Sequence, residues 1–319
     1  MASMTVPDRL ARYGAALLAE WLSHRFETRF ELSGAAGGGF VATVAGHRAG
    51  LYLAPLWEPD AAWTERLRSM EDRLAGRLDG AYLLWAPPRA DLPSDEPAAA
   101  SFVSRVQEAA ATLAPGGTTE VVFPVDVKMA KMREEGGYAS VVGGLSRWWT
   151  RITEQVSGTY YVDSSAVHRL TRDGEARERL WELIGRLSLS VEVGQAVEFE
   201  IEEAWTLQRL PATAGLPAAI ERGVAIVGAP PATDPTEGIA VRRAARKRLL
   251  EANEALGEMD VELRAVGLLG SYEYADLEGA GSTVKALDPA LFNRLEVVCI
   301  LADGDVRPTF LPRALPWAG

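Results

Sequence analysis

The chain has 319 residues, of which 48% are hydrophobic and 24% charged, and its formal net charge is −11. These proportions are those of a folded globular protein and exclude a disordered chain. The negative charge disfavours broad contact with nucleic-acid phosphates, which requires a surplus of lysine and arginine. A single cysteine, Cys299, allows neither an intramolecular disulfide nor a cysteine-ligated zinc site.

The first 128 residues predict a lobe that begins with an amphipathic helix. Phe40–Val44 and Leu51–Leu53 follow as strands, with AGHRAG as the turn between them. Asp60 precedes a second helix, AYLLWAP is a compact buried strand, and a third helix begins near Ser94. TTEVVFPVDVKM is the strand that closes this lobe, which we place at residues 1–128.

The order of these elements predicts an α/β or α+β fold, with helices packed against a mixed sheet. In element order, the lobe resembles the core of restriction-endonuclease-like nucleases. Those nucleases bind a metal ion with an aspartate on the second strand and Glu-x-Lys or Asp-x-Lys on the third. Here the corresponding strand carries Leu51, Tyr52 and Leu53, and FVATV contains no acid. The resemblance therefore implies a degenerate, inactive version of that core.

Residues 129–319 predict a second α+β lobe, with junction helices at 145–187. A short helix from 145 to about 156 precedes the strand TYYV, and GEARERLWELIGRL is a further helix. SVEVGQAVEFEIEEAW predicts a pair of strands that bends near GQ. Asp234 and Glu237 mark the start of a long helix. VELRAVGLLGSYEYA and LEVVCILAD are the last strands.

The beginning of the sequence, MASMTVPDRLARYGAALLAEWL, has no basic leader, no uninterrupted apolar core and no cleavage site. No later run reaches the roughly eighteen apolar residues that span a bilayer. We therefore expect a protein of the prokaryotic (bacterial) cytoplasm that makes no membrane contact. No motif predicts a cofactor.

Asp163, Ser164 and His168 are the candidate catalytic residues, in the segment GTYYVDSSAVHRL. On one helical turn Ser164 and His168 could form a hydrogen bond, as in Ser-His-Asp hydrolases. However, no Gly-x-Ser-x-Gly elbow surrounds the serine. We favour the interpretation that Asp163 caps a short helix after TYYV, because aspartate is a preferred capping residue. Catalysis by these residues is the alternative.

Glu198, Glu200 and Glu202 are the candidate metal ligands, in the strand VEFEIEE. Side chains alternate along a strand, so the three carboxylates share one face. Such a row could bind a cation or a basic partner, but the solvated face of an antiparallel sheet gives the same pattern. A cleft in which they converge with Asp276 or Glu278 would indicate an enzyme.

Arg242, Arg243, Arg246 and Lys247 form a basic stripe along the long helix. The stripe could bind nucleic acid, an acidic partner or the protein's own acidic strand. A solvated, salt-bridged helix face is the more common origin of such a pattern. The stripe contains no interleaved aromatic residue, so it is a poor platform for single-stranded nucleic acid.

Trp148 and Trp149 are candidate interface residues. Neighbouring positions on a helix diverge by about 100°, so the two indoles cannot both face the same core. One of them is therefore available for a contact at an interface or a domain junction, where aromatic anchors concentrate.

No motif in the sequence specifies a reaction. The sequence therefore predicts a non-enzymatic protein-interaction subunit, an accessory or scaffold component of a cytoplasmic assembly. The nuclease resemblance makes an assembly that processes nucleic acid one candidate, by analogy alone. The alternative is a carboxylate-dependent hydrolase or nuclease. The sequence leaves the oligomeric state open.

Overall fold

The computed structural model describes residues 8–36, 38–58, 60–211, 222–233, 238–270 and 288–317. The chain divides into two compact units: unit 1 is Met1–Thr119 with Thr206–Gly319, and unit 2 is Glu120–Trp205. The boundaries lie within two long strands, β5 (Thr118–Arg133) and β8 (Ala196–Arg209). The boundary predicted at residue 128 also lies within β5.

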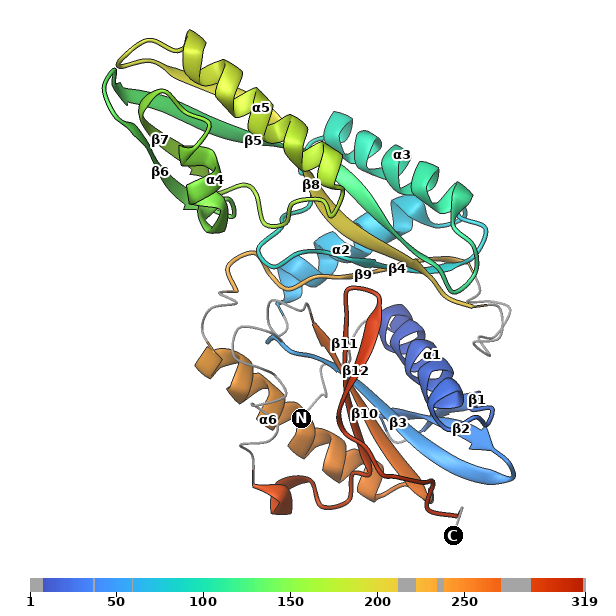
Figure 1. Ribbon diagram of the computed structural model, residues 1–319. Helices are drawn as coiled ribbons and strands as arrows, with labels where there is room; N and C mark the ends of the chain where they lie inside the picture. Colours follow the sequence, from blue (N-terminus) through green and yellow to red (C-terminus); the bar gives the residue numbers. More distant parts are fainter. Residues whose placement is uncertain are drawn as a thin grey trace. The chain divides into compact units, whose positions relative to one another are not determined.

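The described residues form helices and two mixed six-stranded sheets, which confirms the predicted class of mixed sheets with flanking helices (Figure 1). The first sheet contains, in spatial order, β1 (Glu31–Ala36), β2 (Gly39–Val44), β3 (His47–Pro55), β10 (Leu263–Gly270), β11 (Val297–Ala302) and β12 (Asp305–Phe310). The second contains β6 (Gly137–Gly143), β7 (Gly158–Ser164), β5, β8, β4 (Ala81–Trp85) and β9 (Gly223–Val227).

The central strands of the first sheet are buried on both faces. Its central strand β10 runs parallel to β3 and to β11. Helix α1 (Asp8–Arg25) covers one face, where Leu18 packs with Leu53, and helix α6 (Gly238–Gly257) covers the other, where Leu249 packs with Val266 (Figure 1). Parallel strands covered on both faces carry nearly continuous apolar residues, as VELRAVGLLG and LEVVCILAD do.

Helix α1 is buried on a second side within unit 1. Leu83 of β4 and Ala225 of β9 belong to the same core cluster as Leu18. Helices α2 (Ala61–Leu74) and α3 (Glu96–Thr112) complete this part of unit 1. The Trp63 indole of α2 donates a 2.8 Å hydrogen bond to the carbonyl of Gly228, just after β9. Unit 1 therefore contains helix and sheet layers that share α1.

Unit 2 has a sheet with its helices on one face. β7 pairs with β5 antiparallel and with β6 parallel. Helices α4 (Trp149–Thr153) and α5 (Gly174–Ser190) form a core with this sheet that includes Val127, Tyr160 and Ile184. Side chains that alternate with this core point to the other side, which we call the open face of unit 2.

Three local predictions were wrong. Val44 pairs with His47, so Ala45 and Gly46 alone turn the β2–β3 hairpin, with φ of 50° and 87°, instead of AGHRAG. SVEVGQAVEFEIEEAW contains one strand, β8, instead of the predicted pair. Helix α5 continues to Ser190, and the turn near GQ, in which the Gln195 amide donates to the Glu192 carbonyl (3.0 Å) and Gly194 has a φ of 83°, leads directly into β8. The predicted helix at 145–156 is split into a 3-10 turn, η1 (Ser146–Trp148), and α4.

Two predicted features lie outside the described residues: the cap formed by Asp234 and Glu237, and the strand end SYEYA. A 3-10 turn, η2 (Pro289–Phe292), precedes β11. In the part of the chain that the structure describes, no helix combines the length and the apolar composition needed to cross a bilayer.

Candidate functional site

Ser164 and His168 do not contact each other through their side chains. Ser164 ends β7 and is fully buried; its hydroxyl donates to the Val142 carbonyl (2.6 Å) and accepts from the Leu145 amide (3.0 Å). The Nδ1 atom of His168 lies 2.8 Å from a carboxylate oxygen of Glu203 instead. The serine hydroxyl therefore links the end of β7 to the end of β6 and to the residues that follow it.

Asp163 closes a turn. Its Oδ1 accepts hydrogen bonds from the hydroxyl and the amide of Ser165, at 2.6 and 3.0 Å. These bonds hold the pKa of Asp163 below its ordinary value. The Val167 amide donates to the Ser164 carbonyl, but no helix follows before the isolated bridge at Leu170. The short helix predicted here was wrong, because the His168 amide bonds to Glu203 across the sheet rather than to its own turn.

Glu203 was not among the residues predicted from the sequence, yet it is only 3% exposed. Its carboxylate accepts hydrogen bonds from the His168 amide (2.7 Å), His168 Nδ1 (2.8 Å) and Trp205 Nε1 (3.0 Å). A bridge between Leu170 and Glu203 places the segment after β7 beside β8. The signal was the pair of adjacent glutamates: Glu202 and Glu203 must point to opposite faces of a strand.

Glu198, Glu200 and Glu202, which we call the acidic row, are exposed on the open face of unit 2. Lys128 Nζ lies 3.3 Å from Glu198 Oε1. Alternate residues of a strand are about 6.7 Å apart, so the outer two carboxylates of the row begin about 13 Å apart and the row is spread along β8. No group of three His, Cys, Asp or Glu side chains within the described ranges could hold a metal. Asp276 and Glu278 lie outside those ranges.

The basic stripe lies on the exposed side of α6, opposite the buried Leu249 and Ala252. Lys247 Nζ lies 2.9 Å from Glu58 Oε2. Arg248, next to the stripe, is buried and forms a 2.8 Å ion pair with Glu251. The stripe is therefore partly neutralised at its Lys247 end.

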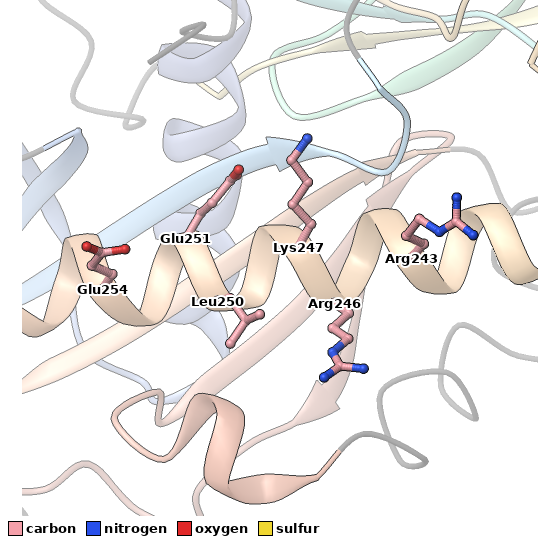
Figure 2. Close-up of a pocket in the computed structure, with 6 residues that line it drawn as sticks. All are labelled: Arg243, Arg246, Lys247, Leu250, Glu251 and Glu254. Atoms are coloured by element: carbon pink, nitrogen blue, oxygen red, sulfur yellow. The ribbon is translucent and has the colours of Figure 1, made fainter. Parts of the chain in front are cut away.

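A shallow hollow lies along the same helix face (Figure 2). It is lined by Arg243, Arg246, Lys247, Leu250, Glu251 and Glu254. In Figure 2, Lys247 and Glu251 extend from one side of α6, whereas Arg246 and Leu250 extend from the other. The mixture of cations, acids and a partly exposed leucine fits a protein surface better than a row of phosphates, which would repel the two glutamates.

The paired tryptophans point in different directions. The Trp148 ring packs against Trp181, with 5.7 Å between the ring centroids, and the Arg177 guanidinium lies 5.7 Å from its centroid. Trp149 is 49% exposed, and its ring lies 6.5 Å from that of Tyr138. Trp149 is thus the residue of the pair that is available to a partner.

Large exposed apolar side chains concentrate in unit 2, which holds six of the eight found among the described residues: Met132, Tyr138, Trp149, Tyr161, Leu189 and Val193. Tyr161 alternates with the buried Tyr160, so it lies on the open face, and Tyr138 alternates in the same way with the buried Ala139. We call Met132, Tyr138, Trp149 and Tyr161 the exposed apolar cluster.

Glu71 is a buried carboxyl group outside these surfaces. It lies on α2 and accepts a 2.8 Å hydrogen bond from the Ile226 amide of β9. Burial raises its pKa to about 7, although that bond and Arg9, 3.6 Å away, oppose the shift. Because Glu71 connects helix α2 to β9, the last strand of the second sheet, its position indicates a structural role.

Comparison with protein-family models, with curated proteins and with solved structures found no match to this chain. The functional assignment therefore depends on the chain's own residues.

Proposed function

We propose that the chain is a non-enzymatic protein-interaction subunit, an accessory or scaffold component of a cytoplasmic assembly. It binds another protein through the exposed apolar cluster of unit 2. The observation that supports this proposal is that Tyr138 and Tyr161 are exposed on the side of the sheet that α4 and α5 leave open, and that the exposed Trp149 ring of α4 lies 6.5 Å from the Tyr138 ring on β6. Exposed aromatic residues grouped in this way are typical of the energetic centre of protein interfaces.

The hydrolase alternative has one arrangement in its favour. Glu203 orients His168 through Nδ1, as a carboxylate orients the general base in serine hydrolases. However, the nearby Ser164 hydroxyl is fully buried and already donates to a carbonyl. Within the described residues the acidic row stays spread along β8, without the convergence that an enzyme requires.

Replacing Tyr161 and Trp149 by serine should weaken partner binding by about 2 kcal/mol or more, roughly thirtyfold, because aromatic anchors carry much of an interface's energy. The measurement is quantitative affinity purification of the tagged chain from cells that make it. Phe310→Ser is the matched control, since Phe310 is 47% exposed and lies in unit 1. Unchanged amounts of every co-purifying protein in the double variant would contradict the proposal.

The basic stripe gives a second test, because it was also a candidate for nucleic-acid binding. We expect no appreciable binding of a short mixed-sequence DNA duplex, since the chain is negatively charged and two glutamates line the hollow of α6. Binding that falls steeply with salt in a titration, and that Arg242→Ala with Arg246→Ala removes, would instead support the nucleic-acid function.

A further inference from the structure

We propose that the exposed face of α6 is a docking surface for a second copy of this chain, and that the acidic row of that copy is the segment it binds. This contact uses other residues than those of the exposed apolar cluster, although Tyr161 shares the open face with the acidic row. It therefore goes beyond the proposed function, and each of the two can fail without the other.

The exposed face of α6 carries positive charges that form no ion pair with other described residues. Arg242, Arg243 and Arg246 are exposed, and the ion pairs of this helix among the described residues are made by Lys247 and Arg248. Leu250, one turn beyond Arg246, is 39% exposed. The face thus offers guanidinium groups followed by an apolar contact, whereas the two glutamates of the hollow lie farther along the helix, and Glu251 is paired with Arg248.

The acidic row supplies the complementary charge on every copy. Asp126 alternates with the buried Val127 on β5, so it too points to the open face. Among the described residues, Lys128 is the cation that pairs with the row, and it reaches only Glu198. Glu200 and Glu202 remain available for a basic partner.

The two rows of charges also match in spacing. Residues four apart on a helix are separated by about 6 Å along its axis, because each residue rises about 1.5 Å. Alternate residues on a strand are separated by about 6.7 Å. Arg242 and Arg246 can therefore each reach one of two successive glutamates, since arginine side chains are long enough to absorb the difference.

The contact joins two different surfaces, so it is heterologous, and each copy offers one of each kind. Exposed ion pairs contribute little individually and are screened by salt. The association should therefore be weak, and its strength should depend on ionic strength.

Sedimentation velocity over a range of protein concentrations tests the proposal. We expect the natural chain to associate at low salt and to dissociate at high salt. Arg242→Glu with Arg246→Glu should weaken association by about tenfold or more, because like charges would then face each other. Arg179→Glu with Arg186→Glu, on exposed positions of α5, changes the net charge equally and should leave association unchanged.

A charge exchange makes the test specific. Glu200→Arg with Glu202→Arg should also abolish self-association, yet an equimolar mixture of this variant with the α6 variant should associate again. Circular dichroism spectra would show that both variants remain folded. A natural chain that is monomeric at every concentration, or a mixture that does not associate, would overturn the proposal. Either result would leave binding of another protein through the exposed apolar cluster untouched.

Discussion

Replacing Glu71 by glutamine should stabilise the protein at pH 8 by up to about 3 kcal/mol, and this gain should shrink as the pH falls. Glu71 is 5% exposed, and burial raises its pKa from 4.5 to about 7. Arg9 and Tyr13 of α1 and the neighbouring Arg68 and Asp72 are the charged and titratable groups around it. Each tenfold difference in proton affinity between the folded and unfolded states corresponds to about 1.4 kcal/mol.

The direction of the effect follows from proton binding. The unfolded chain releases the Glu71 proton near pH 4.5, whereas the folded protein keeps it until about pH 7. The stability that this proton contributes is complete below pH 4.5 and is lost as the pH rises through about 7. Glutamine resembles the protonated carboxyl group and can still accept the hydrogen bond from the Ile226 amide. The variant therefore loses no stability from this group as the pH rises.

Urea unfolding followed by tryptophan fluorescence at pH 5 and pH 8 measures the effect. Glu65→Gln is the control, because Glu65 lies on the same helix with a side chain that is 70% exposed. The difference in the free energy of unfolding between Glu71→Gln and the natural chain should grow with pH, whereas the control difference should stay flat. A constant difference for Glu71→Gln would show that the folded protein lets Glu71 ionise freely.

The sequence predicted best those elements that local patterns determine. Asp60 was expected to precede the second helix, and its carboxylate accepts a 2.7 Å hydrogen bond from the Trp63 amide there. The buried strand AYLLWAP is β4. Apolar periodicity and capping residues act within a few positions of each other, so they are visible in the sequence.

Features that depend on distant partners could not be predicted. The turn at Gly194 and Gln195 was recognisable, but it connects helix α5 to β8 rather than two strands, and its hydrogen bonds with Lys131 reach a distant strand, β5. The exposed acidic row was recognisable from its alternation. The partner of His168 was not, because Glu203 lies 35 positions away and only the pairing of strands brings the two together.

Glu203→Leu should destabilise the protein by about 3 kcal/mol or more. The substitution removes the acceptor of three hydrogen bonds: those from the His168 amide, from His168 Nδ1 and from the Trp205 indole. A buried donor left without an acceptor costs about 1–3 kcal/mol, and leucine can accept none of the three. Glu203→Gln should have a smaller effect, because one acceptor oxygen remains.

The adjacent Glu202 is the matched control for this prediction. Glu202 is exposed on the opposite face of β8, so Glu202→Leu should change the free energy of unfolding by no more than about 0.5 kcal/mol. Urea unfolding of the three variants measures the order, with Leu at position 203 the least stable. Equal effects at positions 202 and 203 would contradict the buried carboxylate. The comparison also bears on function. If Glu203 has a structural role, only the substitutions at position 203 should reduce the free energy of unfolding. If Glu203 belongs to a hydrolase site, Glu203→Gln should lose activity while keeping nearly full stability.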